Sequence, residues 1–263
     1  MYLAALVAAI GDGASIAFGG GGLQRKPMAA AKAIGASALK DLEVISMLGG
    51  PEVDLLIGLG KVRLLRFAFV GFDAYGLAPN FRKARETGTL PIVEYSEATT
   101  LLAFEAGARR LPFQPTRCGL GTDLMTVSTS PFKTMVCPFT GETLLLVPAL
   151  VPDVAIIHVN IADRAGNGVI LGDAYADPLI ARAAKRTYLT ADRVVEELPR
   201  GGMDRRAMLI SRLWVKGVCE TANGAGFTAL YPDHPTNLPA VQAYQAQATD
   251  RAWLDAFTQG AAS

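Results

Sequence analysis

Residues 14–28, ASIAFGGGGLQRKPM, decide the fold of this chain. An apolar strand runs into four glycines, and a basic segment then leads into a helix that Pro27 would begin, since proline is favoured at the first helical position. Glycines in such a turn allow backbone amides to approach a ligand, and a helix N-terminus favours negatively charged oxygen. The stretch therefore predicts a backbone site for an anion. It also fits a tight strand-to-helix connection beside two solvated cations, Arg25 and Lys26.

Short apolar strands and helical segments alternate on the C-terminal side of this turn, as far as residue 110. Such alternation predicts an α/β fold with a largely parallel sheet flanked by helices, whose sites lie at the carboxyl ends of the strands. The expected strands are 14–18, 42–47, 62–70 and 90–95, and the expected helices are 27–36, 51–59, 76–88 and 97–110.

The second half of the chain has a less regular pattern. Residues 111–143 contain several prolines and glycines with little periodicity, which predicts a long functional loop. No internal repeat or linker is visible, so a single domain over residues 1–263 is expected. The remaining expected elements are strands at 144–151, 154–160, 186–190 and 208–218, and helices at 1–10, 177–185 and 238–257.

Composition excludes several classes of protein. With 51% hydrophobic residues, a net charge of +1 and no basic stripe, the chain is a well-cored globular protein and not a general nucleic-acid binder. No apolar run is long enough to span a membrane, and residues 1–10 lack the leading positive charge of a signal peptide. Cys118, Cys137 and Cys219 are odd in number and widely spaced, which fits reduced thiols in a cytoplasmic protein. Two isolated histidines and no CxxC motif argue against a metal site.

Known nucleotide and hydrolase motifs fail on spacing. Lys26 stands between Arg25 and Pro27, so there is no Walker A loop, and Gln24 occupies the position where a dinucleotide fingerprint needs its last glycine. No G-x-S-x-G elbow occurs, and neither histidine has an evident partner. A nucleophile would have to be a carboxylate or a thiol.

Glu97 is the carboxylate candidate, because it stands where an expected strand passes into a helix at the carboxyl edge of the sheet. Ser96 and Glu97 also fit an ordinary cap and first-turn acid. Asp163 and Asn167 fit a turn equally well. Cys118 follows Arg117, which could lower its pKa, although a small buried cysteine is commoner.

Four segments together resemble a known family. Residues 25–28 (RKPM) after the glycine turn, 76–82 (GLAPNFR), 111–123 (LPFQPTRCGLGTD) and 158–167 (HVNIADRAGN) resemble the alpha subunit of family I coenzyme A transferases, and that of the glutaconate CoA-transferases in particular. The resemblance follows the same order over nearly the whole chain.

This resemblance implies the CoA-transferase type of α/β fold and a separately encoded beta subunit, in a heterodimer or heterotetramer with the active site at the interface. Coenzyme A would be a co-substrate, no cofactor would be bound permanently, and the substrates would be an acyl-CoA and a small, dicarboxylic acid. A glutamate of the beta subunit would attack the thioester. The resemblance also implies which residues contact the ligands. The thioester oxygen would contact the backbone of Gly19, Gly20, Gly21 and Gly22. Substrate or CoA would contact Arg25, Lys26, Gly121, Thr122 and Asn167.

A second resemblance leaves the reaction open. The chain is also similar to the alpha subunit of the bacterial hydrolase that opens the last steroid ring as a CoA thioester, and residues 25–28, 49–51 (GGP) and 60–62 (GKV) match that branch. Its catalytic glutamate aligns with Glu97, although Ser96 and Ala98 replace the aspartate and glycine that flank it there. A non-catalytic acyl-CoA-binding subunit is the third possibility.

Overall fold

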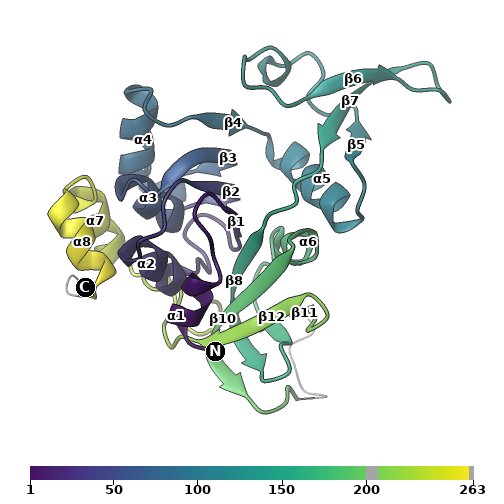
Figure 1. Cartoon of the computed structure of the whole chain (residues 1–263). Helices are drawn as coiled ribbons and strands as arrows, with labels where there is room; N and C mark the ends of the chain where they lie inside the picture. Colours follow the sequence, from purple (N-terminus) through teal and green to yellow (C-terminus); the bar gives the residue numbers. More distant parts are fainter. Residues whose placement is uncertain (200–206, 261–263) are drawn as a thin grey trace.

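The computed structural model describes residues 1–199 and 207–260, and a mostly parallel sheet lies at its centre (Figure 1). The strand order is β11-β9-β8-β1-β2-β3-β4, and β10 pairs with β8 and carries β12. The antiparallel pairs within the described part of this sheet are β8 with β9 and β9 with β11. The strands are β1 (Ser15–Phe18), β2 (Leu42–Gly49), β3 (Val62–Val70), β4 (Ile92–Glu94), β8 (Val154–Asp163), β9 (Gly168–Ile170), β10 (Arg186–Val195), β11 (Met208–Ile210) and β12 (Val215–Glu220).

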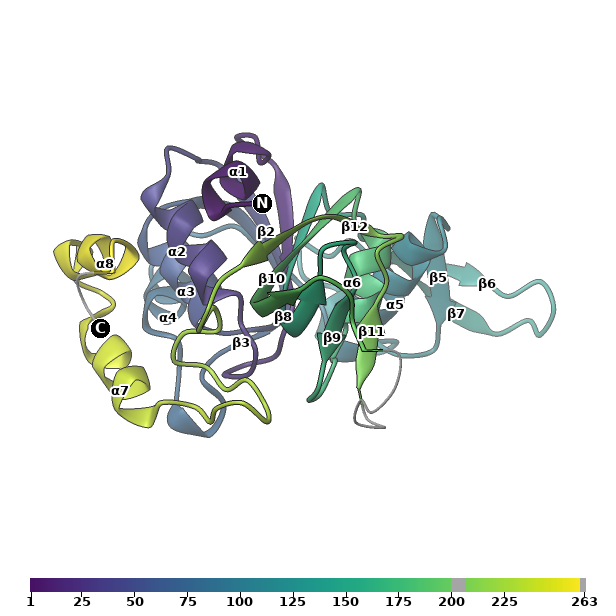
Figure 2. The same cartoon turned by 90° about the horizontal axis from the view of Figure 1, so that it is seen from below.

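Helices cover both faces of this sheet, which confirms the expected α/β fold (Figures 1 and 2). Because side chains alternate along a strand, Ile16 and Phe18 of β1 enter the core under α1–α4, α7 and α8, whereas Ala17 enters the core under α5 and α6. In the described residues, no helix has the length and apolar character needed to cross a membrane. The helices are α1 (Leu3–Ala8), α2 (Met28–Ala36), α3 (Pro51–Gly58), α4 (Pro79–Glu86), α5 (Glu97–Ala108), α6 (Asp177–Ala183), α7 (Leu238–Gln247) and α8 (Arg251–Thr258).

The segment expected as a long loop, residues 111–143, instead contributes two strands to a small antiparallel sheet. Here β5 (Phe113–Thr116) and β6 (Lys133–Val136) pair with either side of β7 (Thr143–Pro148). This sheet projects from the body of the molecule (Figures 1 and 2). The expectation was wrong because Pro115 suggested a loop, whereas proline is tolerated in an edge strand such as β5.

Two other expected elements are divided. The strand expected at 208–218 is β11 and β12 with a turn at 211–214, and the helix expected at 238–257 is α7 and α8. Asp250 begins α8 by accepting hydrogen bonds from the Ala252 and Trp253 amides. Pro27 caps α2 instead of opening it. Apolar patterning continues across each break, so it predicted one element in both cases.

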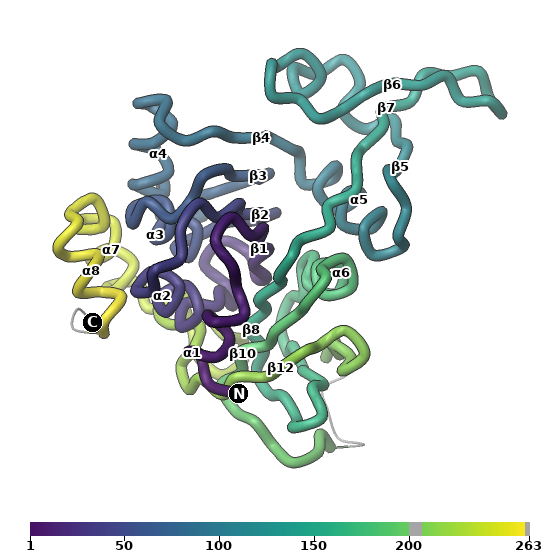
Figure 3. The backbone as a smooth tube through the Cα atoms, viewed as in Figure 1, coloured from purple at the N-terminus to yellow at the C-terminus, as the bar shows by residue number. Residues whose placement is uncertain are grey.

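The carboxyl ends of β1, β2, β3 and β4 meet at one edge of the sheet. Each of these strands is followed directly by a segment that lies at this edge. These segments are the glycine turn (residues 19–22), residues 49–50, residues 71–73 and the start of α5. After α5 the chain leaves for the projecting sheet and returns as β8 beside β1 (Figure 3). Sites predicted far apart in sequence are thereby placed along this edge.

Candidate functional site

All four glycines after β1 donate their backbone N–H groups within the chain. The Gly20 N–H donates to the Asp177 carboxylate, at 2.9 and 3.2 Å from its two oxygens. The turn in this structure therefore offers no free glycine amide to a ligand, contrary to the expectation from sequence, and its contact with a thioester stays a prediction. The other acceptors are backbone carbonyls: that of Ile156 for Gly19, Gln24 for Gly21 and Leu48 for Gly22, at 3.0, 3.0 and 3.1 Å.

Close packing around the turn explains its glycines. The φ of Gly20 is +75°, and a Cβ there would lie 2.5 Å from the Gln24 carbonyl oxygen. A Cβ on Gly21 would lie 2.8 Å from the Tyr175 ring. Real Cβ atoms are not found so close to backbone or ring atoms, so a side chain would force the turn to move.

Arg25 is buried under the turn and does not face solvent. Its Nη1 lies 2.5 Å from the Asp177 carboxylate and donates to the His158 carbonyl at 2.9 Å, and its Nη2 donates to the Asp173 carbonyl at 2.8 Å. The side chain is 4% exposed, and that of Asp177 is 0% exposed. The alternative of a solvated cation is therefore wrong, and Arg25 fastens the turn to the start of α6.

Lys26 is more completely enclosed, with a side chain that is 0% exposed. Its Nζ lies 2.9 Å from a Glu52 carboxylate oxygen and donates to the carbonyls of Leu48 at 2.7 Å, Gly19 at 3.2 Å and Gly20 at 3.3 Å. Burial raises the pKa of Glu52, and the Lys26 charge opposes that shift. Lys26 is thus also not a solvated cation, and its direct contact with substrate stays a prediction.

Glu97, by contrast, is exposed at the first position of α5. Ser96 and Thr99 form a capping box, in which the Ser96 Oγ accepts from the Thr99 N–H at 3.1 Å and the Thr99 Oγ1 accepts from the Ser96 N–H at 2.8 Å. Within residues 1–199 and 207–260, the Glu97 carboxylate has no hydrogen bond or ion pair. A free carboxylate therefore stands at the positive end of a twelve-residue helix.

Gly121 and Thr122 lie in an exposed turn on the α5 side of the sheet. The Thr122 Oγ1 donates to the Gly119 carbonyl at 2.8 Å, which closes the turn. The ring of Tyr95, two residues before Glu97, meets that of Phe132 edge-on at 5.3 Å, so this loop packs beside the start of α5. A Cβ on Gly119 would lie 3.9 Å from the Thr99 side chain, so the turn that contains Gly121 and Thr122 also begins close to the first turn of α5.

Asn167 belongs to a different place, the turn between β8 and β9. Its amide and its Nδ2 both donate to the Asp163 carboxylate at 2.8 Å, and its Oδ1 accepts from the Arg212 N–H at 3.0 Å. Burial acts to raise the pKa of Asp163, but these hydrogen bonds hold it below its ordinary value. Phe18 pairs with Ile156 on β8, so Asn167 lies on the order of 20 Å beyond the end of β1 along that strand.

His158 does have partners, contrary to the expectation. Its Nδ1 lies 2.9 Å from the Thr190 Oγ1, and its Nε2 lies 3.2 Å from the Asp192 carboxylate. Burial lowers the pKa of His158, against the effect of Asp192. The ring is 0% exposed, so these contacts join β8 to β10 inside the core. No group of three or more possible metal ligands was found among the described residues.

Sequence reasoning missed the residues that hold the turn from outside. The Asp73 carboxylate accepts from the Leu23 N–H at 3.0 Å, and Tyr175 covers Gly21. Asp73 and Tyr175 have φ values of +52° and +48°, a conformation that concentrates at functional sites. Their positions after β3 and before α6 mark the edge, but no sequence pattern shows that they approach the turn. A cavity of about 510 Å³ opens beside it, lined by Gln24, Leu171, Gly172, Asp173, Ala174, Met208 and Tyr231.

Three known proteins are similar over most of this chain. The cholesterol ring-cleaving hydrolase IpdA subunit of Rhodococcus jostii is 38% identical over 226 residues, 82% of this chain and 76% of the relative. The A subunit of the 3-oxoadipate CoA-transferase of Pseudomonas knackmussii is 33% identical over 241 residues, 89% of this chain and 84% of the relative. The crystal structure of glutaconate coenzyme A-transferase from Acidaminococcus fermentans matches 99% of this chain and 87% of its own, with a TM-score of 0.89 and 29% identity.

The family profile described as Coenzyme A transferase matches residues 1–218. That range includes the glycine turn and Glu97, which lie at the edge of the sheet, and also the separate turn between β8 and β9. The chain therefore belongs to the coenzyme A transferase family.

Proposed function

We propose that this chain is the alpha subunit of a heteromeric CoA-transferase that moves CoA between an acyl-CoA and a small, dicarboxylic acid. A beta subunit supplies the reacting glutamate, and the two chains form a heterodimer or heterotetramer in the cytoplasm. Coenzyme A enters as a co-substrate and is not permanently bound.

The observation that carries this proposal is that the polar groups around the glycine turn are already hydrogen-bonded within the chain. Asp73 and Asp177 are carboxylates that reach the turn, and both already accept hydrogen bonds: Asp177 from the Gly20 N–H and Asp73 from the Leu23 N–H that follows the glycines. Asp177 is also paired with Arg25. A carboxylate held in this way is a poor nucleophile, because attack would break the buried contacts that hold the turn together. Neither carboxylate of the turn is thus available for attack, which supports the proposal that the nucleophile comes from another chain.

In the proposed reaction the beta-subunit glutamate attacks the thioester carbonyl, which forms an acyl-glutamyl anhydride and releases CoA thiolate. The thiolate then attacks the glutamyl carbonyl, giving a glutamyl-CoA thioester and the free acid. The second acid repeats these steps in reverse, so one difficult exchange is divided into easier ones. The rigid turn forms a wall beside the thioester oxygen, and Gly121 and Thr122, which are exposed, contact CoA.

Arg25, Lys26 and Asn167 act indirectly in this proposal. Arg25 and Lys26 hold the turn in place through their buried ion pairs. Asn167 fixes the turn after β8. A substrate contact from any of them would require these internal contacts to open.

Glu97 supports a second function, a ring-opening hydrolase acting on a cyclic diketone CoA thioester. The carboxylate is exposed, and it is at the end of a helix where negative charge is favoured. Similarity to the cholesterol ring-cleaving IpdA subunit supports this function as well. Glu97 would then act as the base or nucleophile, and no beta-subunit glutamate would be needed.

One experiment separates the two functions. The chain is purified with its beta subunit, in wild-type form, as Glu97→Gln and as the matched Glu94→Gln, which changes an exposed neighbour at the end of β4. CoA exchange between labelled dicarboxylic acids and acyl-CoAs is measured alongside hydrolysis. A transferase shows exchange that Glu97→Gln leaves nearly intact, and borohydride reduction labels a beta-subunit glutamate.

The hydrolase would instead be established if the chain hydrolyses acyl-CoA without CoA exchange. In that case the rate of hydrolysis should fall by roughly 100-fold or more in Glu97→Gln and stay unchanged in Glu94→Gln. If acyl-CoA binds and neither reaction occurs, the chain is a non-catalytic acyl-CoA-binding subunit, and both enzymatic proposals are wrong.

A further inference from the structure

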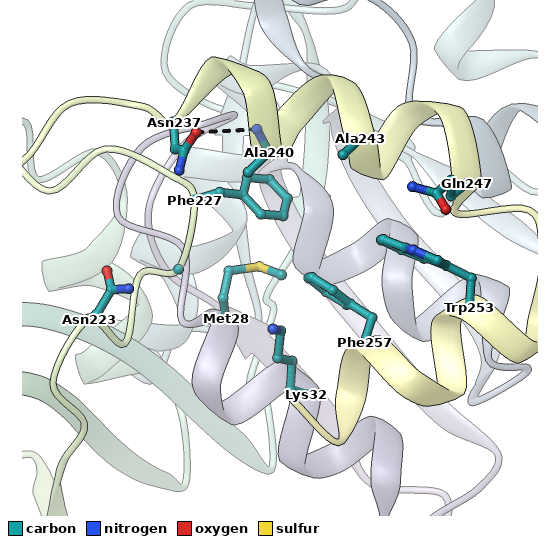
Figure 4. A pocket seen from close by; sticks show the side chains of 11 residues that line it. Met28, Lys32, Asn223, Phe227, Asn237, Ala240, Ala243, Gln247, Trp253 and Phe257 are labelled. Carbon is teal, nitrogen blue, oxygen red and sulfur yellow. Dashed lines mark hydrogen bonds between the residues drawn. The ribbon is translucent and has the colours of Figure 1, made fainter. Parts of the chain in front are cut away.

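A second cavity lies on the opposite face of the sheet from α5, between α2, α7, α8 and the segment before α7 (Figure 4). Its volume is about 240 Å³. It shares no lining residue with the cavity beside the glycine turn. The lining residues are Met28, Lys32, Asn223, Gly226, Phe227, Asn237, Ala240, Ala243, Gln247, Trp253 and Phe257.

Three aromatic rings form part of the wall of this cavity. Trp253 and Phe257 stack with centroids 5.0 Å apart and an interplanar angle of 12°, and Phe227 packs 6.3 Å from Phe257. Phe227, Phe257 and Met28 are otherwise buried in the core, so the cavity reaches inward from the surface. Apolar walls with a few fixed polar groups are typical of small-molecule sites.

Among the described residues, Lys32 is the one cation that lines the cavity, and no acidic residue lines it. The Lys32 Nζ lies over the Phe257 ring, 3.6 Å from its centroid. In the parts of the chain that the structure describes, Lys32 has no carboxylate partner. Burial lowers its pKa, as expected for an ammonium group that has lost water without gaining an anion.

Amide groups at the rim add further hydrogen-bond donors. The Asn237 Oδ1 accepts from the Ala240 N–H at 3.2 Å, so its Nδ2 is left to donate to a ligand (Figure 4). Asn223 and Gln247 also line the rim and can donate. A site with one ammonium, amide donors, aromatic walls and no carboxylate is complementary to an anion with an apolar body.

We propose that this cavity is a second ligand site, which binds a small monocarboxylate with an aromatic or hydrocarbon body. The carboxylate pairs with the Lys32 ammonium, and the apolar body lies against Phe227, Trp253 and Phe257. This site is separate from the acyl-CoA chemistry at the sheet edge. Ligand binding to it can therefore be measured directly, without an assay of enzyme activity.

The test is calorimetric titration of the full chain, alone and with its beta subunit, using 3-phenylpropanoate and its neutral amide as probes. We expect the carboxylate to bind roughly 10- to 100-fold more tightly than the amide, since a hydrogen bond between charged groups is lost with the amide. Carboxylate affinity should fall as rising pH deprotonates Lys32.

Two variants locate the site, with one control. Lys32→Met removes the charge but keeps an apolar stem, and it should abolish the preference for carboxylate over amide. Ala243→Phe places a ring at the mouth from an exposed helical position and should weaken both probes. Lys40→Met, an exposed lysine that does not line the cavity, should change neither. Equal binding of both probes, unchanged preference in Lys32→Met, or loss of binding when the beta subunit is present would each overturn the proposal.

Discussion

The glycine turn and the start of α5 lie at the same edge of one sheet but differ in almost every physical respect. At the turn, the four glycine amides and the buried Arg25 and Lys26 all have partners within the chain. At α5, Glu97 is exposed and has no partner among the described residues. The contacts of the turn fix its backbone conformation, whereas the start of α5 exposes a negatively charged carboxylate to solvent.

Glycine and charge patterns in a sequence therefore indicate where a site lies, but they do not show which of its groups are free to bind a ligand. An ion pair removed from water costs desolvation free energy and is retained only with good geometry, as the Lys26 contacts illustrate. A free carboxylate in water costs nothing to keep. Variants at Lys26, Asp54 and Gly20 test how strongly the buried groups differ from exposed ones.

The largest expected effect comes from Lys26→Met, which leaves Glu52 buried without its cation. We expect the free energy of unfolding in urea to fall by about 3–5 kcal/mol. The double variant Lys26→Met/Glu52→Leu should recover much of that loss, because no charge is then left buried. Arg82→Met, which breaks an exposed pair with Glu86 on α4, is the control and should change stability little. A stable single variant would show that the turn is not held by this pair.

A smaller effect is expected at Asp54, which lies on α3 like Glu52 but has no cation. Its carboxylate accepts from Asn80, the Phe81 amide and Tyr244, and burial raises its pKa to about 6, against these hydrogen bonds. The folded state therefore binds the proton more tightly than the unfolded state does. Its contribution to the free energy of unfolding is fully present below about pH 4 and is lost, by about 3 kcal/mol, as pH rises from about 4 to about 6.

The measurement is urea unfolding of wild type and Asp54→Asn between about pH 4 and pH 7. Because an amide does not titrate in this range, the variant should lack the decline that Asp54 causes in the wild type. Parallel pH profiles for the two proteins would contradict the raised pKa.

The smallest effect separates backbone strain from close packing in the turn. Gly20 and Gly60 have similar φ values, +75° and +69°, but a Cβ on Gly60 would meet nothing within 4 Å. Gly60→Ala should cost about 1 kcal/mol, the strain of a left-handed residue. Gly20→Ala should cost about 1–2 kcal/mol more and lower activity, because its Cβ would displace the turn. Thermal unfolding of both variants measures the difference, and equal losses would mean that the turn is not tightly packed.

Much of the fold could be predicted because the strands and helices up to residue 110 have strong local periodicity. The projecting sheet was missed since β5 and β6 are short, polar edge strands whose pairing with β7 is not a local property. In the site, the positions of Glu97 and the glycine turn at the ends of strands followed from the alternation of strands and helices in the sequence. The partners of the turn did not, because Asp73 and Asp177 come from segments 50 and more than 150 residues away along the chain.

An α/β chain with a glycine turn and a carboxylate at the carboxyl ends of its strands could be predicted from the amino-acid sequence, because these features depend on periodicity and on the alternation of strands and helices. The burial of Arg25 and Lys26 and the hydrogen bonds of the glycine amides are visible only in the folded chain. Both facts depend on contacts between distant segments, where close packing fixes which donor meets which acceptor. The same packing leaves Glu97 in solvent and encloses the cavity over Lys32.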